Sequence, residues 1–369
     1  MTLEMLPAIL IAIAIPLMFL LLVRRLDLYA SGNFATVLLC MGGGMAAFLA
    51  AGQLNCALLP LVGYTLVVTL VAPIVEEVFK SLLLIYFVRQ PEFTYFVDGA
   101  IYGFAAGIAF AVVENLLYLS QTPPTAATGE NLALAVTRAF STSLMHGSAS
   151  ALVGVALGRF RFGRGPGALW ARFGALLLGW GAAMGLHLAF NNLISRDWGL
   201  LTIVLAVALG LGGVLLNALL IRWGLREERA WLQETLNQQV GVSRGEAAVV
   251  QELAQLDRLL APVTARFGAE KRQQVETFLR RQAQLGLKHK VELLTSDPQL
   301  RAAMAAEVTG LRQEVDELRR AIGVYCMSYV RSILPPSGEP LWERLQTTLA
   351  DPPATPKKSL WRTVEQKIN

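Results

Sequence analysis

Seven apolar stretches shape this sequence, because each reaches the roughly 20 residues that a helix needs to cross about 30 Å of hydrocarbon. They cover residues 5–23, 34–54, 60–88, 97–119, 133–158, 169–194 and 198–221. The pattern predicts an all-α, polytopic membrane helix bundle of about seven transmembrane helices. The third and fifth stretches are longer than required, so we expect these two helices to tilt or break.

The composition divides the chain into a membrane part and a water-soluble part. Overall, 54% of the residues are hydrophobic and the mean hydropathy is +0.49, yet about two thirds of the charged residues follow residue 222. We therefore expect a transmembrane domain at residues 1–222 and a cytoplasmic helical or coiled-coil domain at residues 223–334. Residues 335–369 are rich in proline and are expected to form a poorly ordered tail.

The expected cytoplasmic domain carries a heptad-like spacing of apolar residues. The positions in this spacing are Leu300, Met304, Val308, Leu311, Val315, Leu318, Ile322, Tyr325 and Tyr329. Such a stripe is more often the core of an ordinary bundle than the seam of a dimer. A homo-oligomer formed through these C-terminal helices is the alternative that the sequence leaves open.

The distribution of basic residues predicts the orientation in the membrane. They cluster after the first, third, fifth and seventh spans: Arg24 and Arg25; Arg89; Arg159, Arg161, Arg164 and Arg172; Arg222, Arg226 and Arg229. The positive-inside rule then places the N-terminus outside and the C-terminal domain in the cytoplasm. Because Glu4 precedes the first apolar run and arginines follow it, we interpret that run as a retained span rather than a secretory signal.

The net charge bears on the kind of partner. The formal charge is +5, and no basic stripe interleaved with aromatic residues occurs in the sequence. These features argue against binding to nucleic acid. The expected surroundings of the chain are the lipid bilayer.

Ionisable residues occur inside the predicted spans. Glu76, Glu77 and Lys80 lie in the third, and Glu114 lies in the fourth. A carboxylate at bilayer depth is costly unless it is paired, hydrated or neutralised, so such groups mark a functional site. Small residues recur every four positions before Glu114, namely Gly99, Gly103, Gly107 and Ala111. A neighbouring helix can approach such a stripe closely, so we expect the Glu114 carboxylate to face protein rather than lipid.

Histidines occur in the next two spans. His146 begins a second stripe with Ser150, Gly154 and Gly158, and His187 shares a helix face with Asn191, one turn later. We therefore expect polar residues of the third to sixth spans to converge on one intramembrane cavity.

This set of side chains permits hydrolysis inside the membrane. Glutamate and histidine together can move protons at neutral pH. Two histidines with a carboxylate can also hold a zinc ion and leave a position open for water. The sequence has no HExxH helix, no GxSG serine loop and no GxGD aspartyl motif, so it does not match those other protease sites.

Four motifs follow one another between residues 60 and 195. They are VEEVFK with Glu76, Glu77 and Lys80; FxxxEN with Phe110, Glu114 and Asn115; His146 within STSLMHGSASALVG; and HxxxN with His187 and Asn191. In this order and spacing the chain resembles the PrsW family of bacterial intramembrane proteases, which is related to the CAAX prenyl proteases and the bacteriocin-immunity proteins. The resemblance implies an intramembrane protease of the bacterial cytoplasmic (inner) membrane. Its partner would be a membrane-spanning protein substrate, of the anti-sigma-factor type.

The resemblance also implies roles for single residues. Glu76 and Glu77 would activate water, His187 would be essential, and Asn191 would stabilise the oxyanion.

Two further residues would complete the site. If zinc is bound, the expected ligands are Glu114, His146 and His187. The related CAAX-type enzymes have FxxxH where this chain has FxxxE at Glu114. The motifs leave open whether the site holds zinc or works as a glutamate protease.

Each of these residues also has a purely structural interpretation. Glu76 and Lys80 are four residues apart on one helix and could form a buried ion pair. His146 could bridge two helices by a hydrogen bond, and Asn115 could bond to a neighbouring backbone. The alternative function is then a non-catalytic membrane protein, either a proton-coupled transporter or a binding protein with an inactive protease site. A transporter is expected to show internal repeats, and none is clear in the sequence.

Overall fold

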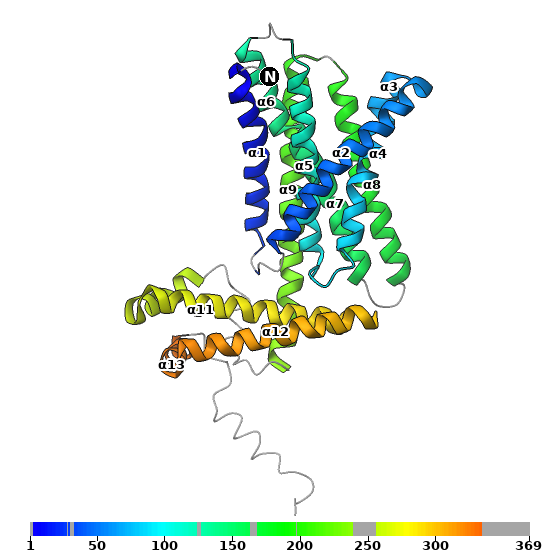
Figure 1. The fold of residues 1–369 in the computed structure, drawn as a ribbon. Helices are drawn as coiled ribbons and strands as arrows, with labels where there is room; N and C mark the ends of the chain where they lie inside the picture. The colour runs from blue at the N-terminus through cyan, green and yellow to red at the C-terminus, as the bar shows by residue number, and fades with distance from the viewer. Residues whose placement is uncertain are drawn as a thin grey trace, which may run out of the picture.

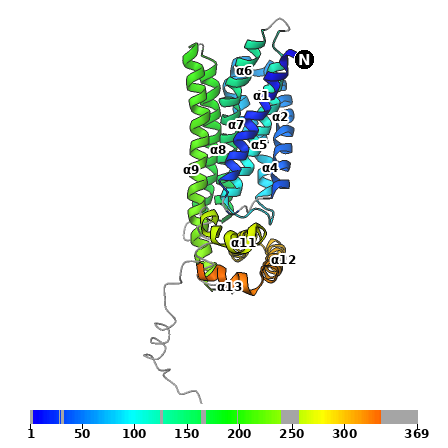
Figure 2. The same ribbon diagram turned by 90° about the vertical axis from the view of Figure 1, so that its left-hand side faces the viewer.

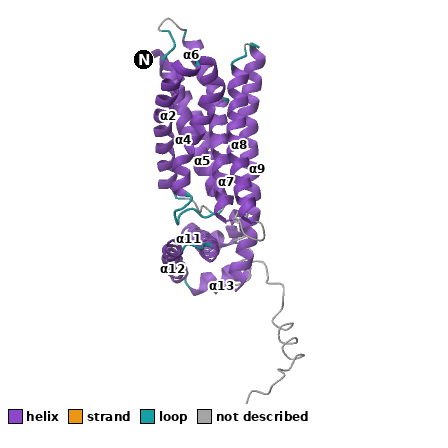
Figure 3. Cartoon of the chain, turned by 90° about the vertical axis from the view of Figure 1, so that its right-hand side faces the viewer, coloured by secondary structure: helices purple, strands orange, loops and turns teal. Residues whose placement is uncertain are grey.

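The computed structural model describes residues 3–27, 29, 33–123, 127–162, 168–196, 198–238 and 256–333. Within this part of the chain, Figure 3 shows helices and loops but no strand, which confirms the predicted all-α class. The elements are a 3-10 turn η1 (Leu3–Met5), α1 (Leu6–Arg25), α2 (Phe34–Val62), α3 (Tyr64–Leu66), a π-helical turn η2 (Val67–Val71), α4 (Ala72–Phe87), α5 (Phe96–Ser120), α6 (Thr128–Phe140), α7 (Thr142–Phe162), α8 (Ala168–Ile194), α9 (Leu200–Gln238), α11 (Leu256–Leu294), α12 (Pro298–Ile322) and α13 (Val324–Ile333).

The helices form two levels. Helices α1, α2, α4, α5, α7, α8 and α9 run side by side as a bundle, with α6 at one end, and α11 and α12 lie across the other end (Figure 1). Figure 2 shows the same two levels from the side. We refer to these as the α6 end and the α11 end. The arginines that close α1 and α7 lie at the α11 end.

Within the described residues, six helical segments are long and apolar enough to cross a membrane, so the chain is a multi-pass membrane protein. They are Leu6–Arg25, Phe34–Val62, Phe96–Ser120, Thr128–Phe162, Leu169–Ile194 and Leu200–Leu232. These correspond to six of the seven predicted spans.

The remaining predicted span, residues 60–88, is divided. Helix α2 continues to Val62, Gly63 adopts a φ of 83°, and η2 precedes α4. A positive φ ends a helix at little cost only at glycine, which explains the position of the break. The predicted fifth span is likewise divided, at Ser141 between α6 and α7.

Helices α5 and α7 form the buried centre of the bundle and touch through their small residues. A Cβ atom added at Gly99, Gly103 or Gly107 would lie 2.2 Å from a backbone oxygen of α7. The close approach predicted from the two stripes of small residues is therefore confirmed. At Gly107 that oxygen belongs to His146, so the stripe fixes His146 against α5, two turns before Glu114.

The contact at Gly107 gives a prediction on stability. Gly107→Ala is expected to destabilise the protein by about 1–3 kcal/mol, because the new methyl group overpacks a backbone contact. Gly42→Ala is the matched control, since a Cβ atom there meets nothing within 4 Å. Thermal unfolding in detergent measures both variants. Equal midpoints for the two would contradict a close α5–α7 contact.

The apolar stripe predicted in the C-terminal region is covered within the chain. Met304, Val308, Leu311 and Val315 of α12 are buried in one core with residues of α11. Gly323, with a φ of 86°, ends α12, and Tyr325 beyond it is 79% exposed. The helix that carries the stripe is thus interrupted at Gly323, but Tyr329 packs against the same core beyond it, so apart from Tyr325 the stripe forms an ordinary bundle core.

The membrane bundle and the C-terminal helices are joined by a continuous helix and by a direct hydrogen bond. Helix α9 runs without interruption across residue 222, where we predicted the domain boundary. The Gln284 side chain of α11 also donates a hydrogen bond to the backbone oxygen of Tyr29, at 3.2 Å. The predicted tail at residues 335–369 lies outside the described residues.

Candidate active site and metal centre

The polar residues singled out in the sequence lie on four helices at one level of the bundle. Glu76 and His146 lie near the starts of α4 and α7, and Glu114 and His187 lie near the ends of α5 and α8. Because α5 and α8 run opposite to α4 and α7, all four positions fall in the half toward the α6 end (Figure 1). The expectation that these helices bring their polar residues together is met.

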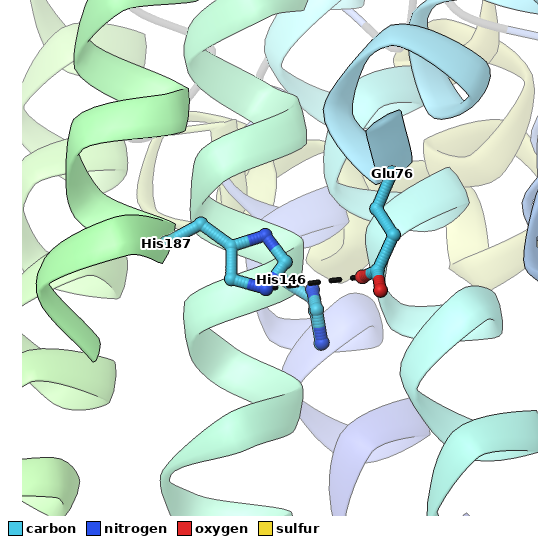
Figure 4. A group of neighbouring side chains, drawn as sticks. All are labelled: Glu76, His146 and His187. Atoms are coloured by element: carbon cyan, nitrogen blue, oxygen red, sulfur yellow. Dashed lines mark ion pairs between the residues drawn. The ribbon is translucent and has the colours of Figure 1, made fainter. Parts of the chain in front are cut away.

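Three of these side chains could hold a metal ion. Glu76, His146 and His187 each offer one ligand atom, and the three atoms lie within 4.8 Å of one another. Figure 4 shows them converging from three helices, with the two imidazole rings close to perpendicular. His187 Nε2 lies 3.8 Å from Glu76 Oε2, and both histidines are at most 2% exposed.

Glu77 and Lys80 form an ion pair beside this group. Lys80 Nζ lies 2.8 Å from Glu77 Oε1 and 4.0 Å from Glu76 Oε2, so the closer partner is Glu77 rather than the predicted Glu76. Glu77 Oε1 also lies 3.0 Å from His187 Nδ1. Glu77 is 0% exposed and Lys80 is 2% exposed, so each charge depends on the other for compensation. Lys80 Nζ also lies 2.7 Å from His146 Nδ1.

Glu114 lies behind His146. Its Oε2 atom is 3.1 Å from His146 Nε2 and accepts a hydrogen bond of 2.8 Å from Arg138 Nη2. Arg138 Nε donates in turn to Asn115 Oδ1 at 2.9 Å, and the Asn115 amide donates to Ser143 Oγ at 2.8 Å. The FxxxEN motif thus supplies one carboxylate for the histidine and one amide that holds the arginine.

Asn191 contacts the broken part of the third predicted span. Its Nδ2 atom donates to the backbone oxygen of Val68 at 2.9 Å, and Asn192 donates to the backbone oxygen of Thr69 at 3.0 Å. Both acceptors belong to η2, a π-helical turn that directly precedes α4. Turns of this kind are frequent at functional sites. The two amides therefore tie α8 to the segment that positions Glu76.

The residues present fit a metal ion. Glu76 Oε2 is buried and has no hydrogen-bond partner among the described residues. Two imidazoles with a carboxylate make a donor set that suits transition-metal ions and leaves a coordination position open. Each histidine also has a carboxylate at one ring nitrogen, Glu77 at His187 Nδ1 and Glu114 at His146 Nε2. The other nitrogen of His146, Nδ1, lies 2.7 Å from Lys80 Nζ and would exchange this contact for the ion. Such carboxylates commonly orient ligating histidines.

The fold and the site together define a class: a multi-pass membrane protein with a buried glutamate–histidine group able to bind a metal ion. The sequence model of one protein family, the PrsW family intramembrane metalloproteases, matches residues 31–222, just over half of the chain. The chain therefore belongs to this family of intramembrane metalloproteases, and its substrates are expected in the lipid environment of the membrane. No curated protein and no solved structure matches the chain.

Two residues of the site were not predicted as part of it. Arg138 lies within the fifth predicted span, residues 133–158, where a charged residue signals a functional partner. Asn55 Nδ2 donates a hydrogen bond of 3.4 Å to Glu76 Oε1. An amide near the end of an otherwise apolar span was the available signal for this contact.

Proposed function

We propose that this chain is a zinc-dependent endopeptidase of a bacterial inner membrane that cuts membrane-spanning protein substrates, of the anti-sigma-factor type. The observation that carries the proposal is the buried group of Glu76, His146 and His187, within 4.8 Å, in a chain of a metalloprotease family. The N-terminus lies outside and the C-terminal helices are cytoplasmic, because the basic residues gather at the α11 end.

In this proposal Glu76, His146 and His187 hold the zinc ion. When bound, the ion would polarise the scissile carbonyl and make a water molecule more acidic. Glu114 orients His146 rather than binding the ion, because its Oε2 atom already accepts from Arg138 and lies 3.1 Å from His146 Nε2. The ligand set with Glu114 in place of Glu76 is the alternative to be tested.

Glu77 is the proposed general base. Its Oε1 atom holds Lys80 and His187, whereas its Oε2 atom is buried and has no hydrogen-bond partner among the described residues. Oε2 is therefore free to accept the proton of the attacking water. Lys80 compensates the Glu77 carboxylate before this proton transfer, and Glu76 Oε2, 4.0 Å from Lys80 Nζ, is the carboxylate that stays beside the ammonium after it.

Asn191 is the proposed oxyanion donor. One N–H of its amide is used by the backbone oxygen of Val68. A primary amide has two N–H groups, so the second can donate to the oxyanion that forms when water attacks the carbonyl. The first bond would hold the amide in position.

The depth of the site in the membrane predicts where the substrate is cut. Glu114 lies six residues before the end of α5, which is about 9 Å along a helix. With the α11 end in the cytoplasm, this places the reacting peptide bond in the outer half of the membrane. Glu76 and Glu114, at 13% and 18% side-chain exposure, form the more accessible side of the site.

A cleavage assay tests the function. The purified full chain is placed in liposomes with single-span proteins whose membrane segments differ in sequence. Cleavage is expected to stop after treatment with a zinc chelator and to return when zinc is added, because the three-ligand site needs the ion to activate water.

Two results would count against the proposal. Full cleavage by a preparation without bound metal would show that the site works as a glutamate protease without zinc. Binding of substrates without any cleavage, by protein that contains zinc, would favour the binding protein with an inactive site.

A further inference from the structure

A cavity of about 690 Å³ lies at the α11 end, between the membrane bundle and the α11–α12 pair. Its wall on the bundle side comes from the first residues of the α4–α5 connection, the last residues of α7 and an early turn of α8. Its other wall comes from the end of α11, the α11–α12 connection and the first turns of α12. The basic residues that line it are Arg89, Arg161 and Arg172. The cavity is separate from the Glu76 site, which lies toward the α6 end (Figure 1).

Two of these arginines are held in place by backbone oxygens. Arg161 Nη1 donates to three backbone oxygens of the α4–α5 connection, at 2.5–3.2 Å, and Arg172 Nε donates to that of Phe160 at 2.5 Å. Within the described residues, no carboxylate lies at ion-pair distance from either guanidinium group, and Arg161 Nη2 has no hydrogen-bond partner. The buried Asp98 carboxylate offsets part of the Arg161 charge, whereas no ion pair involves Arg89 or Arg172 within the described residues, so the cavity wall carries a net positive charge.

The one acidic residue of the lining has another task. Asp297 Oδ1 accepts hydrogen bonds from the backbone N–H groups of Gln299 and Leu300, at 2.9 and 3.1 Å, and so caps α12. Its carboxylate is not directed at an arginine. Three arginines outnumber Asp297 and the buried Asp98 beside Arg161, so the cavity has a net positive charge that suits an anion.

Exposed apolar side chains adjoin the arginines. Tyr86 is 57% exposed near the end of α4, three residues before Arg89, and Leu169 and Phe173 are 59% and 47% exposed on either side of Arg172 on α8. In a multi-pass membrane protein such side chains face lipid. A ligand that matches both features has an anionic head and apolar chains, since an inorganic anion would use only the arginines.

We propose that this cavity binds the phosphate headgroup of an anionic phospholipid, with its acyl chains against α4 and α8. Basic pockets between membrane helices on the cytoplasmic side are suited to such headgroups. Because the cavity has walls from both levels of the fold, the bound lipid fastens the α11–α12 pair to the membrane bundle.

Lipid counting by native mass spectrometry tests the proposal on the full chain in neutral detergent. Wild type is expected to bind phosphatidylglycerol saturably and to show no bound phosphatidylcholine at the same concentration. The double variant Arg89→Gln/Arg172→Gln is expected to bind phosphatidylglycerol about 30-fold more weakly, from about 1 kcal/mol per arginine. Arg161 stays unchanged in this design because it holds the α4–α5 connection.

Matched variants separate charge in the cavity from charge elsewhere. Arg301→Gln removes an exposed charge of α12 that does not line the cavity, and it is expected to bind as wild type does. Arg89→Lys/Arg172→Lys removes the same two arginines but keeps the charge, and it is expected to retain the preference for phosphatidylglycerol. This result would show that weaker binding by the glutamine variant comes from lost charge rather than from misfolding. Equal binding of the two lipids, or unchanged affinity in the glutamine variant, would overturn the proposal. Displacement of phosphatidylglycerol by an equal concentration of inorganic phosphate would also overturn it, in favour of a soluble anion.

Discussion

A Glu77→Gln variant is expected to lose peptide-bond cleavage by about 10²- to 10⁴-fold while it still folds in the membrane. The amide has nearly the shape of the carboxylate and can still accept from His187 Nδ1, which lies 3.0 Å from Oε1. It cannot take a proton from water. Lys80 keeps a carboxylate neighbour in this variant, because Glu76 Oε2 lies 4.0 Å from its Nζ atom. The measurement is kcat/KM for a single-span substrate in liposomes.

A second glutamate serves as the control for this variant. Glu130 is exposed at the start of α6, at the same end of the bundle as the site. Glu130→Gln is expected to cleave as wild type does. Undiminished cleavage by Glu77→Gln would mean that Glu77 is only a structural partner of Lys80.

Lys80→Met is expected to have the largest effect on stability, a loss of about 3–5 kcal/mol in the free energy of unfolding. The substitution leaves Glu77, at 0% exposure, without the ammonium that lies 2.8 Å from its Oε1 atom. Thermal unfolding in detergent measures the loss. Removing one partner of a buried pair costs more than removing both, since the remaining charge is uncompensated.

The double variant Glu77→Gln/Lys80→Met therefore tests the reason for the loss. It is expected to be more stable than Lys80→Met alone, because no uncompensated carboxylate remains. If the loss of stability in the double variant, relative to wild type, equals the sum of the two single losses, the two charges do not interact, and the ion pair does not account for the cost of Lys80→Met.

The sequence predicted most of the fold because the length and the apolar character of a membrane helix are local properties. Six of the predicted spans are continuous helical segments, or nearly so, at the expected places. The division of residues 60–88 was expected only as a tilt or a break. Its form, a π-helical turn whose backbone oxygens at Val68 and Thr69 are held by amides of α8, depends on residues 123 positions away.

The sequence predicted which residues form the site but not which of them contact one another. The small-residue stripe placed Glu114 inside the bundle, and the motifs named both histidines. The sequence could not show that Lys80 pairs more closely with Glu77 than with Glu76, because both spacings suit one helix face. Nor could it show that Arg138 reaches Glu114, since that contact depends on how α6 packs against α5.

The resemblance and the structure offer different carboxylates for the metal site. Sequence comparison suggested Glu114 as the carboxylate ligand, whereas the group within 4.8 Å contains Glu76. A carboxylate that orients a ligating histidine contributes about 10- to 100-fold to metal affinity, and a direct ligand contributes more. The two assignments therefore predict opposite rankings of Glu76→Gln and Glu114→Gln by their loss of zinc affinity.

The most direct test of the central claim is the zinc affinity of purified Glu76→Gln and Glu114→Gln proteins, measured by competition with a chelator of known affinity. Wild type is expected to hold about one zinc ion per chain. Glu114→Gln is expected to bind zinc about 10- to 100-fold more weakly, and Glu76→Gln is expected to lose more than that. Wild-type affinity in Glu76→Gln, with loss of zinc from Glu114→Gln, would contradict a metal centre formed by Glu76, His146 and His187.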